Sequence, residues 1–179
     1  MSVEIVNILS EKDCQFLRGI FQKLVGDKYE TYANLSAVVK KDISVDSMPS
    51  LYLENWKSIE RKFDEYTDEK SYTHYLLLYE KGALANRHMD TCPTTIITIL
   101  KKSDDLIGGE NFVEDRTNER TEIGCTIGQS VLYRNHLTHG VTEVIQGKRL
   151  VLVSWYGNPI VDTEGMRKKN ILPTTKWVD

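Results

Sequence analysis

The chain has 179 residues, which is a common size for one globular domain. Apolar residues make up 40% of the chain, so a largely disordered, collagen-like or coiled-coil protein is excluded. The 23 basic residues are outnumbered by 26 acidic ones, which gives a net charge of −3. Binding to nucleic acid through bulk positive charge is therefore not expected. We expect a single domain over residues 1–179.

The three cysteines lie far apart and form no C-x-x-C pair, which favours a reducing compartment over a disulfide-rich secreted protein. The first residues lack the basic stretch and apolar core of a secretory signal. The apolar runs are much shorter than the roughly 20 residues that cross a bilayer. These features predict a cytoplasmic protein that does not associate with membranes, and they leave its oligomeric state open.

The first 70 residues predict one strand and two helices. Val3–Ile8 alternates apolar and polar residues, as a strand does. Ser10 is placed to cap a helix that ends at Gly26. A second helix is predicted from about Leu53 to Tyr66, because large apolar residues recur there at helical spacing. We expect residues 1–70 to form a helical support region.

From residue 71 onward the chain changes to short β-type segments separated by glycine-containing turns. The predicted strands are Tyr75–Tyr79, Thr94–Leu100, Glu122–Thr126, Val131–Tyr133 and Arg149–Tyr156. Strands that follow an early helical pair indicate a mainly β sandwich or barrel with helices packed on one side. Residues 71–157 would form this core. Residues 158–179 would form a tail, as a lid, a packed arm or a frayed end.

A metal site is suggested by His88 and Asp90, which are separated by one residue. On an extended segment, residues two apart point to the same face, so this imidazole and carboxylate can hold adjacent positions of one metal ion. A second imidazole from a distant strand would complete the two-histidine, one-carboxylate facial triad, which is typical of non-haem Fe(II) oxygenases. His136 and His139 both follow a predicted strand and are candidates for this third ligand.

Arg149 begins an apolar strand, and a buried arginine is costly unless it meets an anion. Its planar fork suits a carboxylate. A metal with open positions and a nearby arginine would together fit a dicarboxylate that chelates the metal at one end and pairs with the arginine at the other. Lys148 is the competing cation, but adjacent strand residues face opposite sides, so only one of the two can point inward.

These residues belong to a longer series of spaced motifs. The series is Tyr79-x-x-Gly82, His88-x-Asp90, Gly108-Gly109-Glu110-x-Phe112, Gly128-x-x-Val131-Leu132-Tyr133, His139-Gly140-Val141-x-x-Val144-x-x-Gly147-x-Arg149 and finally Trp155. In this order and spacing, the chain resembles the prolyl 4-hydroxylase branch of the Fe(II)- and 2-oxoglutarate-dependent dioxygenases over roughly residues 3–156.

The resemblance implies a double-stranded β-helix, the jelly-roll or cupin-like fold, with supporting N-terminal helices. It implies that His88, Asp90 and His139 hold the catalytic Fe(II). His139 is preferred to His136 because only His139 is in register with the motif that ends in Arg149. Arg149 would bind the distal carboxylate of 2-oxoglutarate.

Further residues of the implied cosubstrate site follow from the same resemblance. Tyr79 matches a family tyrosine whose hydroxyl helps to bind 2-oxoglutarate, and Trp155 would be a wall of the pocket or part of the core. A second family tyrosine, on the strand after the first ligands, is missing, because the corresponding run contains Ile99. Thr98 or Tyr133 would then supply that contact.

The implied reaction couples O₂ and 2-oxoglutarate to the hydroxylation of an aliphatic C–H bond, with release of succinate and CO₂ and with ascorbate as an optional reductant. Asp90 favours hydroxylation over the halogenation carried out by relatives that lack this carboxylate. A prolyl residue of a peptide or protein is the first substrate expected, although Ala85 replaces an aromatic residue that many prolyl hydroxylases carry. Trp155 stands where nucleic-acid demethylases of the superfamily have a second arginine, so a nucleic-acid substrate is not expected.

A free amino acid or another small metabolite is the alternative substrate. A peptide enzyme would have an open groove beside the iron, flanked by mobile segments such as Thr31–Ser50 or the tail. A metabolite enzyme would present a cation to a substrate carboxylate, for which Arg87 and Arg134 are candidates. A non-enzymatic, cupin-like metal-binding domain is a third interpretation, which the inward-facing Arg149 disfavours.

Overall fold

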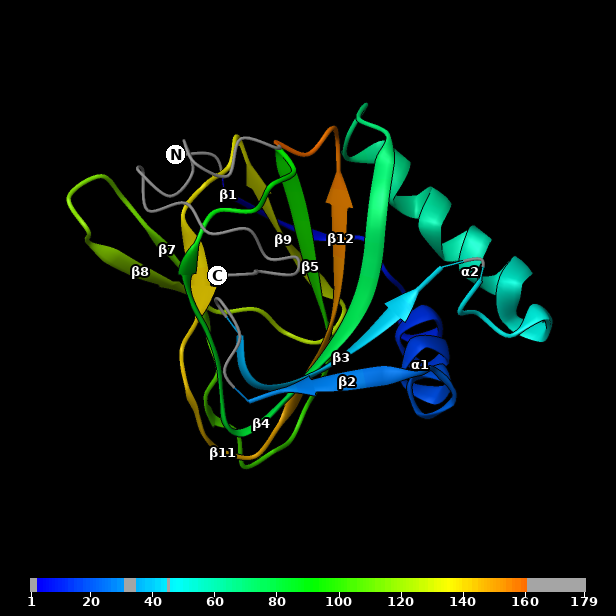
Figure 1. The fold of residues 1–179 in the computed structure, drawn as a ribbon, viewed down its shortest axis with the longest axis horizontal. Coiled ribbons are helices and arrows are strands. Elements are labelled where there is room, and N and C mark those ends of the chain that lie inside the picture. Colours follow the sequence, from blue (N-terminus) through cyan, green and yellow to red (C-terminus); the bar gives the residue numbers. More distant parts are fainter. Residues whose placement is uncertain (1–2, 31–34, 45, 161–179) are drawn as a thin grey trace.

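A curled, ten-stranded antiparallel sheet forms the centre of the computed structural model, which describes residues 3–30, 35–44 and 46–160 (Figure 1). Its strands are β1 (Val3–Asn7), β2 (Gly26–Tyr29), β3 (Leu35–Ile43), β4 (Ser71–His88), β5 (Thr94–Lys102), β7 (Asn111–Glu114), β8 (Arg120–Ile123), β9 (Gln129–Arg134), β10 (His139–Val141) and β12 (Arg149–Tyr156). The strand order is β1-β9-β5-β12-β4-β10-β7-β8, and β3 joins β2 to the side of β4. A separate two-stranded sheet pairs β6 (Ile107–Gly108) with β11 (Val144–Gln146).

Strand β4 belongs to both halves of this sheet. Its first part, up to Tyr79, pairs with β12, whereas Ala85 and His88 near its end pair with β10. Between these parts lies Gly82, whose φ of 83° is a conformation that glycine adopts without steric cost. The strand therefore continues from a large half, made of β1, β9, β5, β12, β4, β3 and β2, into a small half of β10, β7 and β8. This curled arrangement is the predicted jelly roll.

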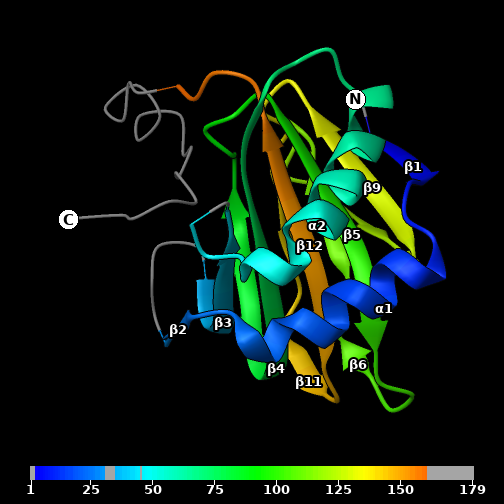
Figure 2. The same cartoon turned by 90° about the vertical axis from the view of Figure 1, so that its right-hand side faces the viewer.

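Two helices cover the outer face of the large half (Figure 2). Helix α1 (Glu11–Ile20) begins with a capping box, because the amide of Asp13 donates to Ser10 Oγ and the amide of Ser10 donates to Asp13 Oδ2. Helix α2 (Leu53–Glu60) packs its buried Trp56 and Ile59 toward the sheet. The predicted placement of helices on one side of a β structure is confirmed.

Alternating side chains give the large half two apolar faces. Leu76 and Leu152 join the cluster under the helices, and their neighbours Leu77 and Val153 join the cluster inside the roll. All of β12 and the first seven residues of β5 are buried, because both strands are covered on both faces. The inner cluster surrounds the polar residues that form the candidate site.

The helices are shorter than predicted. Helix α1 is followed by a 3₁₀ segment at Phe21–Lys23 and α2 by another at Arg61–Glu65, and a third, Ser50–Tyr52, precedes α2. Such tighter turns are frequent at the ends of α-helices. The apolar spacing that suggested a helix to Tyr66 is therefore shared between an α-helix and a 3₁₀ turn.

Several strands differ from the prediction. Strands β2 and β3, which lie in the predicted helical support region, and β7 were not predicted at all, and β4 extends far beyond Tyr75–Tyr79. The strand expected at Glu122–Thr126 is instead β8, which ends at Ile123. In β3 the apolar alternation is interrupted at Ala37, whose φ of 53° accompanies a shift in the pairing with β4.

Parts of the predicted lid and tail segments lie outside the described residues, namely 31–34, 45 and 161–179. The described start of the tail is held in place, because the amide of Ile160 donates to the carbonyl of Thr91 over 2.8 Å. Within the described ranges, no helix has the length and apolar character required to span a bilayer.

Candidate metal centre

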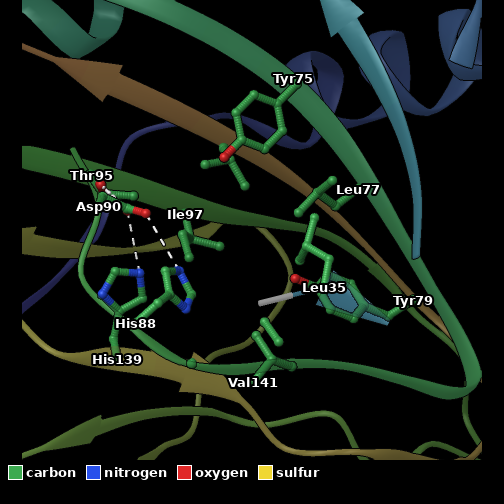
Figure 3. Close-up of a pocket in the computed structure, with 13 residues that line it drawn as sticks. Leu35, Tyr75, Leu77, Tyr79, His88, Asp90, Thr95, Ile97, His139 and Val141 are labelled. Carbon is green, nitrogen blue, oxygen red and sulfur yellow. Dashed lines mark hydrogen bonds and ion pairs between the residues drawn. The ribbon is translucent and has the colours of Figure 1, made fainter. Parts of the chain in front are cut away.

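Three potential ligands meet inside the roll, at the junction of its two halves (Figure 3). His88 ends β4, Asp90 follows two residues later, and His139 begins β10, where it is paired with His88. One ligand atom from each lies within 4.8 Å of the other two, and all three residues are buried. The structure thus brings together the three predicted metal ligands.

The two imidazoles are oriented by the backbone. His88 Nδ1 lies 2.6 Å from the carbonyl of Asn86, and His139 Nδ1 lies 2.7 Å from the carbonyl of Leu137. A carbonyl accepts only, so Nδ1 carries the proton in both rings and the lone pair of the neutral ring is on Nε2. These Nε2 atoms point to Asp90, at 3.4 Å from Oδ1 and 3.3 Å from Oδ2. The geometry is that of metal ligands with oriented rings.

The charge of Asp90 is stabilised by its neighbours. Burial raises the pKa of this carboxyl group, but the charge and hydrogen bonding of His139 and His88 outweigh burial and hold the pKa well below its ordinary value. Burial likewise lowers the pKa of His139, and Asp90 reverses this, so the pKa of His139 is raised. The hydroxyl of Thr95 also donates to Asp90 Oδ2. A carboxylate kept ionised in a buried place is suited to a divalent cation.

The pocket beside these ligands is mostly apolar. It is lined by Leu35, Tyr75, Leu77, Tyr79, Ala85, Thr95, Ile97, Gly140, Val141 and Val153, in addition to the three ligands (Figure 3). Such a lining would exclude water from a metal held by the three ligands and would leave the orientation of a bound molecule to a few polar groups.

Arg149 reaches the inside of the roll from β12 and is 1% exposed. One of its nitrogens, Nη2, donates to Asn111 Oδ1 over 3.0 Å, and Nη1 donates to the carbonyl of Gly109. Its Nε has no partner among the described residues, and none of their carboxylates lies within ion-pair distance. The guanidinium is 5.3 Å from the ring centre of Tyr79. A buried cation that lacks a counter-ion fits the predicted partner of a dicarboxylate.

Two buried tyrosines lie close to the metal ligands, and the charge of Arg149 acts on both of them. Tyr79 lines the pocket, and burial, opposed by the charge of Arg149, raises its pKa to about 12. Tyr133 stacks on His139 with ring centres 4.2 Å apart. Its hydroxyl is buried without a partner among the described residues, and burial raises its pKa as well, although Arg149 again opposes the shift. Both hydroxyls therefore stay protonated and can donate to a carboxylate.

The structure separates Thr98 from the other predicted cosubstrate residues. Ile97 and Ile99 on the same strand belong to the inner cluster, so Thr98 between them faces the helices, where its hydroxyl bonds Ser130 Oγ over 2.6 Å. Thr98 is therefore not at the site, and of the two residues proposed to replace the missing tyrosine only Tyr133 is. Trp155 faces inward and packs edge-on against Tyr75, with no hydrogen-bond partner for Nε1 among the described residues.

The other competing residues also lie elsewhere. His136 bonds the backbone carbonyl of Asp90 through Nδ1, over 2.9 Å, and is not one of the clustered ligands. Lys148, which precedes β12, is exposed and lies on the helix side of the sheet, near Arg18 and Phe21. Arg87 and Arg134, the candidates for a substrate carboxylate, form 3.0 Å ion pairs with Glu114 and Glu4 respectively.

Two residues of the site were missed from the sequence. Asn111, which holds Arg149, occupies the unspecified position of the Gly-Gly-Glu-x-Phe motif and is buried, but its burial is visible only in the structure. Thr95, which bonds Asp90, carries no distinguishing signal in a strand that contains three threonines.

No protein-family model and no curated protein matches the chain. Among solved structures, a Pseudomonas putida prolyl-4-hydroxylase is similar over 87% of this chain and 92% of that chain, with 15% identity and a TM-score of 0.64. An oxidoreductase of the 2OG-Fe(II) oxygenase family from Burkholderia pseudomallei is similar over 88% and 87%, with 14% identity and a TM-score of 0.69. HygX from Streptomyces hygroscopicus, with nickel and 2-oxoglutarate bound, is similar over 87% and 82%, with 9% identity and a TM-score of 0.66. The chain therefore shares the fold of these three proteins.

Proposed function

We propose that the protein is an Fe(II)- and 2-oxoglutarate-dependent dioxygenase that hydroxylates an aliphatic C–H bond. The observation that carries this proposal is the buried cluster of His88, Asp90 and His139 on the same inner face as Arg149, which forms no ion pair with any described residue. Two imidazoles and one carboxylate fit Fe(II) and leave open positions for further ligands. The orphaned Nε of Arg149 and the hydroxyl of Tyr133 fit the distal carboxylate of 2-oxoglutarate.

Each residue has a defined task in this proposal. His88, Asp90 and His139 hold the metal, and the backbone carbonyls behind the two rings fix the direction of their Nε2 atoms. Arg149 anchors 2-oxoglutarate, and the hydroxyls of Tyr79 and Tyr133 orient it. When bound, iron and 2-oxoglutarate supply the oxidising chemistry, in which O₂ is consumed and succinate and CO₂ are released.

The walls of the pocket serve the same reaction by excluding water. Leu77, Ile97 and Val153 surround the ligands with apolar surface, which strengthens the electrostatic interactions within the pocket and limits side reactions. Asn111 keeps the guanidinium of Arg149 from turning away from the pocket.

We further propose a prolyl residue of a peptide or protein as the substrate. The similarity to a prolyl-4-hydroxylase supports this choice. A small metabolite is the second candidate, and it is supported by the similarity to HygX, which has a comparable TM-score and has a structure with hygromycin B bound. Mass spectrometry of the products from peptide and amino-acid panels distinguishes the two, because turnover confined to free amino acids would rule out the prolyl-peptide substrate.

An anaerobic titration tests the proposed reaction class. Fe(II) and then 2-oxoglutarate are added to the metal-free protein, and the visible spectrum is recorded after each addition. We expect a weak charge-transfer band that needs both additions and is absent from His139→Ala. Arg149→Ala should still bind iron but require far more 2-oxoglutarate, and His136→Ala, a nearby histidine outside the cluster, should behave as the wild type. Bound iron with no band on adding 2-oxoglutarate would instead indicate a metal-binding, cupin-like domain.

A further inference from the structure

The inner face of the large half continues past the pocket onto β3. In an antiparallel pair, directly opposed residues point to the same face of the sheet. Lys40 is opposite Leu77, and Asp42 is opposite Tyr75. Both Leu77 and Tyr75 line the metal pocket. Lys40 therefore lies on the same face as the metal ligands, at the rim that β3 adds to the pocket.

The ammonium group of Lys40 is close to the pocket itself. Its Nζ lies 4.4 Å from the ring centre of Tyr75. The ring of Tyr75 extends from β4 into the pocket on the side of Asp90 (Figure 3). A single aromatic ring thus connects the Lys40 ammonium to the pocket, and it stabilises the cation through its π face.

The charged side chain of Lys40 is largely buried, but its ion-pair partner is distant and exposed. The side chain of Lys40 is 18% exposed, and Asp42, the carboxylate within ion-pair range among the described residues, is 3.9 Å away and 68% exposed. Burial lowers the pKa of Lys40, and Asp42 and the more distant Asp27 only oppose that effect. The next residue, Lys41, is different, since it faces the helices and donates to the carbonyl of Phe21 over 2.7 Å.

The other cations near the site are already engaged. Arg149 points to the cosubstrate region and is held by Asn111. Arg87 and Arg134 form ion pairs with glutamates away from the pocket. Lys102, which is opposite Arg149 and so on the same face, pairs with Glu110 at 3.6 Å. Of these cations, Lys40 has the longest ion pair and the most exposed partner, so it is the one most available to a second anion.

We propose that Lys40 binds a carboxylate of the primary substrate at the rim of the pocket, so that the substrate belongs to a class that carries a carboxylate close to the carbon to be hydroxylated. This inference rests on the proposed dioxygenase function. The carboxylate is either the free carboxylate of an amino acid or an acidic side chain next to the target residue of a peptide. In both cases a charge-assisted hydrogen bond from Nζ would position the substrate above the metal.

Isothermal titration calorimetry tests this proposal without turnover. The protein is loaded with Zn(II) in place of Fe(II) and with 2-oxoglutarate, and the binding of substrate-like probes is measured. Two matched pairs of probes are used. One pair is L-proline and L-prolinamide, and the other is a capped pentapeptide with a central proline followed by glutamate or by glutamine. We expect the carboxylate member of at least one pair to bind about tenfold more tightly than its amide, which corresponds to about 1.4 kcal/mol.

Variants assign this preference to Lys40. Lys40→Met, which keeps the length of the side chain, should abolish the preference, and Lys40→Arg should retain it and thereby show that a folded pocket is present. Lys28→Met is the matched control, because Lys28 lies on neighbouring β2, is opposite Val39 on the other face and pairs with Glu30 at 3.0 Å. This control should keep the preference of the wild type.

The results separate the two proposals. Equal or absent binding of the members of both pairs, or an unchanged preference in Lys40→Met, overturns the role of Lys40. The pair that shows the preference identifies the source of the carboxylate. Failure of the wild type to bind 2-oxoglutarate in the same calorimeter overturns the proposed function and this inference together, whereas binding of 2-oxoglutarate without any carboxylate preference overturns the inference alone.

Discussion

At the scale of single residues, Arg149 depends on two partners that come from outside its own strand. The carbonyl of Gly109 and the side chain of Asn111 accept its hydrogen bonds. Neither partner cancels the positive charge, because both are neutral. The arginine is thus held in one orientation with its charge available for an anionic ligand.

Asn111→Asp tests this arrangement by placing a carboxylate where an amide oxygen now accepts from Arg149. The new ion pair should compete with 2-oxoglutarate for the guanidinium and weaken its binding by at least about tenfold, or roughly 1.4 kcal/mol. Iron binding should be unchanged. The dissociation constant of 2-oxoglutarate, measured anaerobically with Fe(II) present, checks this, with Asn118→Asp in the exposed β7–β8 turn as the matched control. Unaltered affinity in Asn111→Asp would show that Arg149 does not bind the cosubstrate.

Tyr133→Phe removes one buried hydroxyl and leaves the stacking on His139 in place. If this hydroxyl donates to 2-oxoglutarate, its loss should cost about 1.5–3 kcal/mol of binding free energy, the usual value for a hydrogen bond to a charged group. Tyr156→Phe is a matched control, since its hydroxyl is also buried without a partner among the described residues, but on the helix-covered face. An equal affinity for 2-oxoglutarate in wild type and Tyr133→Phe would exclude the contact.

At the scale of elements, a polar contact fastens α2 to the sheet. His74 on β4 lies under the helix, with Nδ1 2.8 Å from Ser154 Oγ and Nε2 3.1 Å from Glu60 Oε1. Its ring also packs edge-on against Trp56 of α2. Because Glu60 is the last residue of α2, this contact fixes the position at which the helix ends over the sheet.

The Glu60 contact makes stability depend on pH. Hydrogen bonding to His74, reduced by burial, lowers the pKa of Glu60 in the folded protein. Its contribution to the free energy of unfolding is therefore present above the ordinary pKa of glutamate, about 4.3, and is lost as the pH falls through the lower folded value. Urea unfolding at a series of pH values should show this loss in the wild type and a flatter profile in Glu60→Gln. Glu54→Gln, in the exposed first turn of α2, should leave the profile as it is.

The elements that the sequence predicts well are those with one uninterrupted signal. The capped start of α1 and the apolar runs of β5 and β12 fall into this class. Strand β3 does not, because a bulge at Ala37 interrupts its alternation, and its pairing depends on the remote β4. Strand β4 was predicted only in part, since Gly82 looks like the end of a strand in the sequence but bends a continuous one in the structure.

The candidate site shows the same division. His88 and Asp90 are neighbours in one extended segment, so their common face follows from the alternation alone. The partnership of Arg149 with Asn111 joins β12 to β7, which are not adjacent in the sheet, and no local pattern specifies which side chains meet across the roll. Thr98 was misplaced for a simpler reason, because a shift of one residue along a strand exchanges its two faces.

At the scale of the whole molecule, a bound metal would cross-link β10 of the small half to β4, the strand that runs through both halves of the roll. His88 is the last residue of β4, Asp90 follows it, and His139 begins β10, so one ion would cross-link two strands that are in register only at His88 and Ala85 of β4. Zn(II) at about 100 times its dissociation constant should stabilise the fold by about 2.7 kcal/mol. Thermal unfolding should therefore show a raised Tm with Zn(II) that EDTA reverses. His139→Ala should show no such rise and His136→Ala the full rise, and a rise in both variants would place the metal elsewhere.

The position of β12 has a consequence for the synthesis of the chain. This last strand of the described residues lies between β4 and β5, which are both made much earlier. Until β12 leaves the ribosome, β4 and β5 each present an open edge to solvent, and such edges can pair with other chains. Arg149 begins this strand, so a nascent or truncated chain without β12 would contain His88, Asp90 and His139 but would lack both the closed sheet and the proposed arginine anchor of the dicarboxylate.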